Sequence, residues 1–103
     1  MTPQEVLAAL IKQGGASMDS VGACRLRGLN GRKCALGWLI PDEAYHPIME
    51  IQSLAAMALA LDFSTVSPII LRQMQCAHDV ASRSSGNWAD LITNEWKARG
   101  LPT

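Results

Sequence analysis

The stretch that decides the expected fold class runs from Cys24 to Leu36 and reads CRLRGLNGRKCAL. Apolar and basic residues alternate in its first half and less regularly in its second, as in strands with one buried face. The Asn30-Gly31 pair at its centre is typical of a tight turn between two antiparallel strands. The stretch therefore predicts a two-stranded β-hairpin. The inner face of this hairpin would consist of Cys24, Leu26, Cys34 and Leu36, and its outer or edge positions of Arg25, Arg27 and Lys33.

Helix signals surround this stretch on both sides. Thr2-Pro3 and Ser67-Pro68 each place a capping side chain directly before a proline, a combination that favours the start of a helix. Asn87, followed three residues later by an acidic residue, is also typical of a helix start. The four main helices are expected at residues 3–13, 49–62, 68–83 and 88–99. The second of these is apolar on nearly all sides, which indicates a central position.

Together these elements predict an α+β fold in which four main helices pack with one two-stranded antiparallel β-hairpin. The chain has 103 residues, the size of one domain, so we expect a single small globular domain over residues 1–103. The residues expected in its core are Ile51, Leu54, Leu61, Ile70, Met74, Trp88, Leu91 and Trp96.

The composition favours a cytoplasmic protein that does not enter a membrane. The longest apolar run, from Leu54 to Leu61, is far shorter than the roughly 20 residues that cross a bilayer. The first residues are neither basic nor followed by the apolar core of a signal peptide. The three cysteines, an odd number without a C-x-x-C pair, fit a reducing compartment.

Charge is distributed unevenly along a chain whose nine basic and nine acidic residues balance. A basic hairpin can bind an acidic protein surface or phosphate, although it can also be a solvated strand edge. Nucleic acid is the weaker alternative, because no aromatic residue lies between Met18 and Gly37. The predicted partner-binding residues are the four basic residues of the hairpin and the two acidic residues that follow it: Arg25, Arg27, Arg32, Lys33, Asp42 and Glu43.

The cysteine and histidine residues are the candidates for a metal centre or a catalytic site. Cys76 and His78 are two residues apart in an expected helix, so they face different directions and cannot serve one metal. Cys24 and Cys34, with His78 or His46, could hold zinc, but their spacing is not that of a zinc knuckle. Packing in the core is the alternative for these thiols. We therefore predict no catalytic residue, no metal and no cofactor, while the sequence leaves open whether Cys24, Cys34 and His78 share a site.

The run from Cys24 to Tyr45, which includes GRKCALGWLIPDEAY, resembles a family of small, mostly uncharacterised proteins encoded by bacteriophages and prophages. In that family a cysteine and a basic strand precede a Gly-Arg/Lys-Cys-Ala-x-Gly stretch, which Leu-Ile-Pro-Asp-Glu-x-Tyr follows. The resemblance covers about residues 22–80, although Leu26 stands where an aromatic residue is frequent and the glycine after Glu50 is missing. A later Leu-x-x-x-Gln-x-x-His-Asp element of the family is matched here by Leu71, Gln75, His78 and Asp79.

The resemblance implies a phage-borne accessory protein that acts in the cytoplasm of a bacterial host. Small phage proteins of this kind, anti-CRISPR proteins among them, frequently block a host machine by binding it. We therefore expect a non-enzymatic protein, monomeric or homodimeric, that inhibits a bacterial protein or ribonucleoprotein defence complex by protein–protein interaction. One alternative is a nucleic-acid-associated accessory or regulatory protein that uses the basic hairpin. A second is a small metal-assisted enzyme built on Cys24, Cys34 and His78.

Overall fold

The computed structural model of the chain describes residues 1–51 and 66–103, and the regular structure in these ranges is helical. Within these ranges, four α-helices and three short 3₁₀-helices follow one another. The α-helices are α1 (Pro3–Gln13), α2 (Ala35–Leu39), α4 (Pro68–Ser82) and α5 (Trp88–Ala98). The 3₁₀-helices are η1 (Leu29–Gly31), η2 (Asp42–Ala44) and η3 (Pro47–Ile51).

The long helices begin at the capping residues that the sequence indicates, which confirms three of the expected helices. Thr2 and Glu5 form a reciprocal capping box at the start of α1, with N···O distances of 3.2 and 2.9 Å. The Ser67 side chain accepts a hydrogen bond from the backbone of Ile70, and Asn87 caps α5 in the same way. These caps satisfy backbone N–H groups that a helix start otherwise leaves unpaired.

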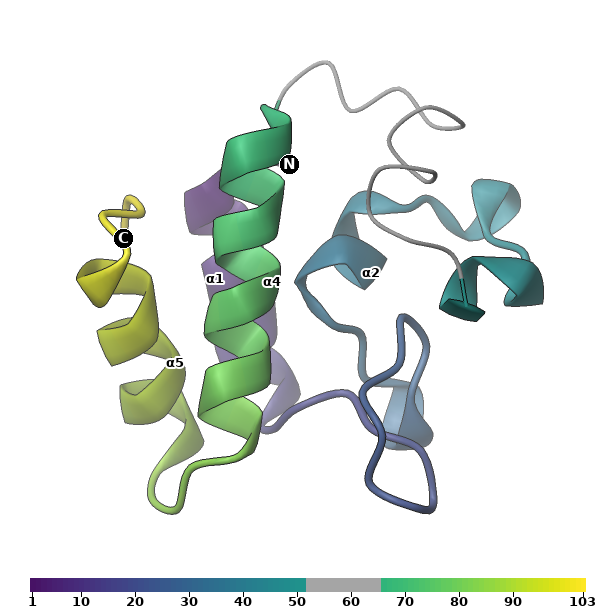
Figure 1. Cartoon of the computed structure of the whole chain (residues 1–103), viewed down its shortest axis with the longest axis horizontal. Coiled ribbons are helices and arrows are strands. Elements are labelled where there is room, and N and C mark those ends of the chain that lie inside the picture. The colour runs from purple at the N-terminus through teal and green to yellow at the C-terminus, as the bar shows by residue number, and fades with distance from the viewer. Residues whose placement is uncertain (52–65) are drawn as a thin grey trace.

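The three long helices and α2 enclose the core of the described part of the chain. Helix α5 packs against α1 and α4, while α2 contacts the same two helices (Figure 1). Of the expected core residues, Met74 and Trp96 are buried, whereas Ile70, Trp88 and Leu91 are partly buried against the core. Ile51 is 84% exposed, so its expected place in the core is wrong. Leu54, Leu61 and most of the helix expected at 49–62 lie outside the described residues.

The α+β fold expected from the sequence is wrong for the part of the chain that the structure describes. Residues 1–51 and 66–103 contain no β-strand, and the expected hairpin is reduced to an isolated antiparallel bridge between Arg27 and Lys33. The central turn itself does form, as η1 (Leu29–Gly31), and Asn30 adopts a left-handed conformation with φ 61°. The arms on either side of this turn do not pair further.

Side chains from other elements take the backbone groups that a hairpin would use. The Glu50 carboxylate accepts hydrogen bonds from the backbone N–H groups of Leu26 and Arg27, at 2.7 and 3.1 Å. The Gln13 amide accepts from the N–H of Lys33 at 3.0 Å and donates to its carbonyl at 2.8 Å. The two arms share one backbone hydrogen bond, from the Gly28 N–H to the Arg32 carbonyl at 2.9 Å. Side chains, rather than the opposite arm, satisfy the N–H groups of Leu26, Arg27 and Lys33.

The second expected strand ends early because the chain turns into helix α2. The Cys34 sulfur accepts a hydrogen bond from the backbone N–H of Gly37 and so caps this short helix. A Cβ atom at Gly37 would collide with the backbone carbonyl oxygen of Leu26, so the helix passes close to the first arm only because this residue is glycine. Leu26, Cys34 and Leu36 are buried as expected, but by contact with helices rather than as one face of a hairpin. Cys24, the fourth residue expected on that face, is exposed.

Candidate functional site

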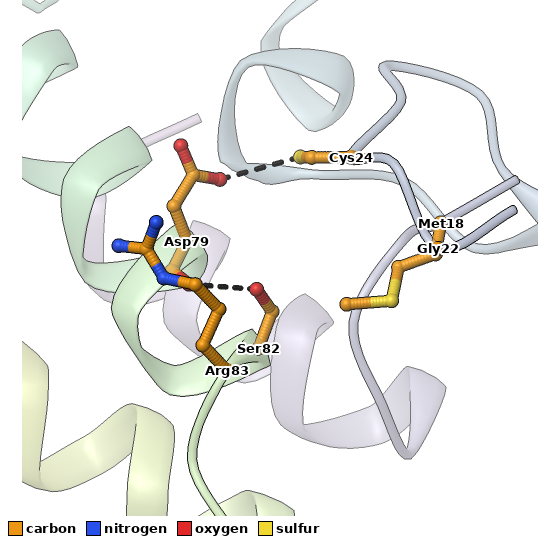
Figure 2. Close-up of a pocket in the computed structure, with 6 residues that line it drawn as sticks. All are labelled: Met18, Gly22, Cys24, Asp79, Ser82 and Arg83. Carbon is orange, nitrogen blue, oxygen red and sulfur yellow. Dashed lines mark hydrogen bonds between the residues drawn. The ribbon is translucent and has the colours of Figure 1, made fainter.

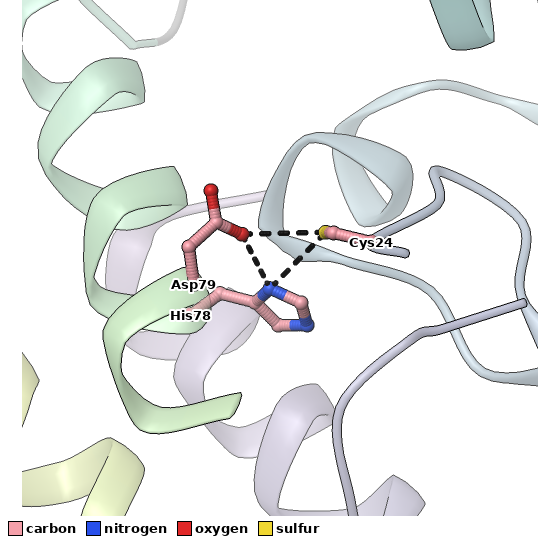
Figure 3. A group of neighbouring side chains, drawn as sticks. All are labelled: Cys24, His78 and Asp79. Carbon is pink, nitrogen blue, oxygen red and sulfur yellow. Dashed lines mark hydrogen bonds and ion pairs between the residues drawn. The ribbon is translucent and has the colours of Figure 1, made fainter. Parts of the chain in front are cut away.

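The two parts of the sequence that carry the resemblance meet in space beside helix α4. Cys24, from the first part, contacts His78 and Asp79, from the second (Figure 3). The Cys24 Sγ atom lies 3.2 Å from Asp79 Oδ1 and 3.7 Å from His78 Nδ1. His78 Nδ1 lies 3.1 Å from Asp79 Oδ1, so the three polar atoms form a closed triangle.

Asp79 is the acceptor at the centre of this cluster. Its Oδ1 atom faces the Cys24 thiol, the Nδ1 atom of His78 and the side-chain amide of Gln75, whose Nε2 lies at 3.0 Å. The other end of the Gln75 amide accepts a hydrogen bond from the backbone N–H of Leu36, which ties α2 to α4. Burial raises the pKa of Asp79, but the hydrogen bonds from His78 and Cys24 outweigh it, so the pKa lies below its ordinary value.

The hydrogen bonds of His78 determine which of its nitrogens carries a proton. The imidazole is fully buried, and its Nε2 atom accepts a hydrogen bond from the backbone N–H of Ser17 at 3.2 Å. A neutral imidazole carries one proton, which must then sit on Nδ1 and point to Asp79. Trp88 packs edge-on against the ring, at 5.9 Å between centroids, and helps to hold this orientation.

Burial and the neighbouring polar groups shift the pKa of His78 in opposite directions. Burial lowers the pKa of His78, whereas its hydrogen bonds with Asp79 and Cys24 raise it. The Ser17 N–H opposes protonation, because a protonated Nε2 would face a second donor instead of accepting from it. We therefore describe His78 as neutral, with its proton on Nδ1.

A metal ion does not fit the hydrogen-bond pattern of this cluster, although the spacing of its atoms would suit one. Cys24 Sγ, His78 Nδ1 and Asp79 Oδ1 all lie within 4.8 Å of one another, as three ligands of one zinc ion would. Binding through Nδ1 would move the imidazole proton to Nε2, where the N–H of buried Ser17 already points. The metal would therefore leave two donors facing each other inside the protein.

The same pattern argues against a Cys/His nucleophile. Contact with the Cys34 thiol and burial raise the pKa of Cys24 above its usual range, which keeps it a protonated thiol. The Nδ1 atom of His78 carries a proton and cannot remove one from Cys24. The cluster has the properties of a structural link between the loop at Cys24 and helix α4.

A small hollow of about 220 Å³ opens beside this link (Figure 2). Its polar wall includes Asp79 and Arg83, while the Ser82 hydroxyl donates to the Asp79 carbonyl at 2.6 Å. The lining residues are Met18, Gly22, Cys24, Asp79, Ser82 and Arg83. The thiol, the carboxylate and the hydroxyl at this hollow all have partners within the chain.

Two of the predicted partner-binding cations interact with the acidic segment that follows α2. Arg27 donates to the carbonyls of Gly37 and Ile40 at the end of α2, both at 2.9 Å. Asp42 Oδ1 lies 3.0 Å from Arg27 and 3.4 Å from Lys33 Nζ. The side chains of these cations are only 19% and 23% exposed, although the sequence suggested an outward position. Arg27 thus also stabilises the fold.

The other predicted partner-binding residues are more widely separated. Arg25 lies 3.4 Å from Glu50 and 3.9 Å from Asp19. The guanidinium group of Arg32 lies against Gly15, just beyond the end of α1. Glu43 is exposed in η2, next to Asp42, whose side chain is 82% exposed. The binding role of these residues stays a prediction.

Glu50 is a central polar residue that the sequence analysis did not identify as one. Its carboxylate receives the backbone N–H groups of Leu26 and Arg27 and the Tyr45 hydroxyl, the last at 2.7 Å. Burial raises the pKa of Glu50, but these donors and Arg25 hold it below its ordinary value. No local pattern could have shown this role, because the two backbone donors lie in a loop far earlier in the chain.

The carboxylates of Glu50 and Asp79 allow a prediction of how the free energy of unfolding depends on pH. The pKa values of Glu50 and Asp79 are lowered by folding, so the native chain binds their protons less readily than the unfolded chain. Their contribution to stability is therefore complete above about pH 5 and is lost as the pH falls through about 4 and below. Urea unfolding between about pH 3 and 7 should show this fall, and a constant free energy of unfolding over that range would contradict the assignment.

In the described ranges, 1–51 and 66–103, no helix is long and apolar enough to cross a membrane. No protein-family model, curated protein or solved structure matches the chain.

Proposed function

We propose that this chain is a non-enzymatic binding protein that inhibits a bacterial defence complex through protein–protein contact in the bacterial cytoplasm. The main observation that supports a non-enzymatic role is the hydrogen bond from the Ser17 N–H to His78 Nε2. This bond leaves His78 without a free lone pair for Cys24 or for a metal. The bacterial partner is suggested by the resemblance to phage-encoded proteins.

The distribution of charge favours a protein partner over nucleic acid. Asp42 and Glu50 lie within 4.0 Å of Arg27, Lys33 or Arg25, so carboxylates offset much of the basic charge of the loop. Nucleic acid would require several cations free to neutralise phosphates. A surface with both signs of charge is instead suited to a partner surface of complementary pattern.

Capture of the bacterial partner by charge-swapped variants tests the proposal. Arg32→Glu combined with Glu43→Lys exchanges two predicted contact charges and leaves the net charge unchanged. We expect this variant to fold but to bind the captured partner at least about tenfold more weakly, which corresponds to about 1.4 kcal/mol. Asp90→Lys combined with Lys97→Glu is the matched control on α5, where both residues are exposed, and it should bind like wild type.

The variant Cys24→Ser distinguishes a binding protein from the alternative of a metal-assisted enzyme. Serine can still donate a hydrogen bond to Asp79, so this variant should fold, capture the partner and inhibit it like wild type. Loss of inhibition by a folded Cys24→Ser that still binds, or stoichiometric zinc in the purified protein, would support the metal-assisted enzyme instead. Binding to DNA or RNA that weakens steeply with salt would support the nucleic-acid alternative.

A further inference from the structure

A groove opens beside Trp38, away from the Cys24 cluster. It has a volume of about 450 Å³ and lies between helix α1 and the segment that runs from η1 into α2. Its walls are mainly apolar and are formed by Ala9, Lys12, Gln13, Gly31 and Trp38. Leu29, in the same turn as Gly31, is 53% exposed and adds apolar surface to this turn.

The groove is held in shape by Gln13. Its Oε1 atom accepts hydrogen bonds from the indole N–H of Trp38 and the backbone N–H of Lys33, both at 3.0 Å. Its Nε2 atom donates to the carbonyls of Gly15 and Lys33, both at 2.8 Å. All the hydrogen-bonding capacity of the side-chain amide is used, so the indole is fixed before any partner arrives. A rigid aromatic side chain lowers the entropic cost of binding.

One cation lines this apolar groove, and two others lie beside residues that line it or follow them in the chain. Lys12 lines it, and the Nζ atom of Lys33 lies 4.8 Å from the centre of a Trp38 ring. Arg32 follows Gly31 directly and packs against Gly15 at the end of α1. In the described part of the chain, no carboxylate lies within 4.0 Å of the charged nitrogens of Lys12 or Arg32. At Lys12 and Arg32 the edge of the groove therefore carries positive charge that no carboxylate of residues 1–51 and 66–103 balances at close range.

We infer that this groove is a docking site for an acidic segment of a protein partner that places an apolar side chain against Trp38. This inference rests on the proposed binding function and names the chemistry of the partner. The apolar walls fit a Leu or Phe side chain, and neighbouring carboxylates of the segment would pair with Lys12 and Arg32. Tryptophan and arginine are the residue types that most often dominate binding energy at interfaces.

A nucleic acid is the less suitable occupant of the same groove. One aromatic residue could stack on a base, but a phosphate backbone would also pass the carboxylates of Asp42 and Glu43 beyond Lys33. Of the cations at or beside this groove, only Lys12 and Arg32 lack a carboxylate within 4.0 Å among the described residues, too few to follow a strand of phosphates. A short acidic peptide can meet these two cations without reaching the acidic segment.

Peptide titration followed by NMR tests the inference directly. The probe is the peptide Gly-Asp-Glu-Phe-Asp-Leu-Gly, and two control peptides replace its acidic residues with lysine or its Phe and Leu with alanine. We expect the acidic apolar peptide to shift the indole N–H signal of Trp38 and the backbone signals of Ala9 and Gly31. Both control peptides should bind at least about tenfold more weakly, which corresponds to about 1.4 kcal/mol.

Two lysines form a matched pair for the test of charge. Lys12 and Lys97 each lie in the last turn of an 11-residue helix and are both exposed, but only Lys12 lines the groove. Lys12→Gln should weaken binding of the acidic peptide at least threefold, whereas Lys97→Gln should leave it unchanged. Both variants remove one positive charge at the same kind of helix end, so their stabilities should be similar.

The outcomes distinguish this inference from the proposed function. Absence of shifts at millimolar peptide, shifts away from the groove, or equal binding of the lysine peptide would overturn the docking site. Tighter binding of a single-stranded oligothymidylate at Trp38 would also overturn it and identify nucleic acid as the occupant. If the captured bacterial partner still binds Lys12→Gln as well as wild type, the groove is not its docking site while the binding function stands. If the peptide binds as expected but the chain proves catalytic, the groove stands and the proposed function fails.

Discussion

Replacing His78 with alanine should lower the free energy of unfolding by about 3–5 kcal/mol. The imidazole is fully buried, and its removal leaves a cavity beside Trp88. It also leaves the backbone N–H of Ser17 without its acceptor in a site that excludes water. A buried donor without a partner costs about 1–3 kcal/mol by itself, and the cavity adds to this cost. Chemical unfolding monitored by circular dichroism measures the difference.

Cys76→Ala is the control for this prediction on the same helix. Cys76 lies two residues before His78, is only partly buried and forms no part of the cluster, so its loss should cost about 1 kcal/mol or less. His78→Gln should lose less stability than His78→Ala, because the glutamine oxygen can accept the Ser17 N–H. A loss below about 1 kcal/mol for His78→Ala would show that the link between the loop and α4 does not hold the fold together.

Glu50→Gln should lower the free energy of unfolding by about 2–4 kcal/mol, although the two side chains have nearly the same shape. The carboxylate has two acceptor oxygens, which receive the N–H groups of Leu26 and Arg27 separately. An amide offers one oxygen, and its NH₂ group would face the second N–H donor. The negative charge opposite Arg25 is also lost. Amide hydrogen exchange should accelerate most at Leu26 and Arg27.

Glu43→Gln is the matched control, because it makes the same chemical change at an exposed carboxylate nearby. Its effect on the free energy of unfolding should stay within about 0.5 kcal/mol. The Glu50→Gln variant should also lose part of the decrease in stability below about pH 5, since a glutamine does not titrate. Equal stabilities of the two variants would show that Glu50 does not organise the loop around Leu26.

Arg27 illustrates why charge patterning alone misplaced part of the predicted binding surface. In the sequence it belongs to a dense group of basic residues, which suggests a solvent-facing role. In the structure its guanidinium group donates hydrogen bonds to backbone carbonyls at the end of α2 and lies 4.9 Å from the centre of the Tyr45 ring. Arginine can serve both a fold and an interface, and spacing in the sequence does not separate the two. A charge reversal at Arg27 would therefore disturb folding as well as binding.

The sequence by itself determined the elements whose causes lie within a few residues. Thr2, Ser67 and Asn87 cap helices through hydrogen bonds to residues three positions later, so their role can be read directly. The turn at Asn30 also follows from the local preference of Asn-Gly for a left-handed conformation. In each case the interacting groups are already neighbours in the unfolded chain.

Only the tertiary structure decided which groups the backbone on either side of that turn binds. Alternating residues predicted two paired strands, but the backbone groups of the arms bind the side chains of Gln13 and Glu50 instead. The meeting of Cys24 with His78 and Asp79 likewise joins segments that are distant in the chain. A backbone N–H is satisfied equally well by a strand or by a buried carboxylate, and the packing of the helices determines which of them is within reach.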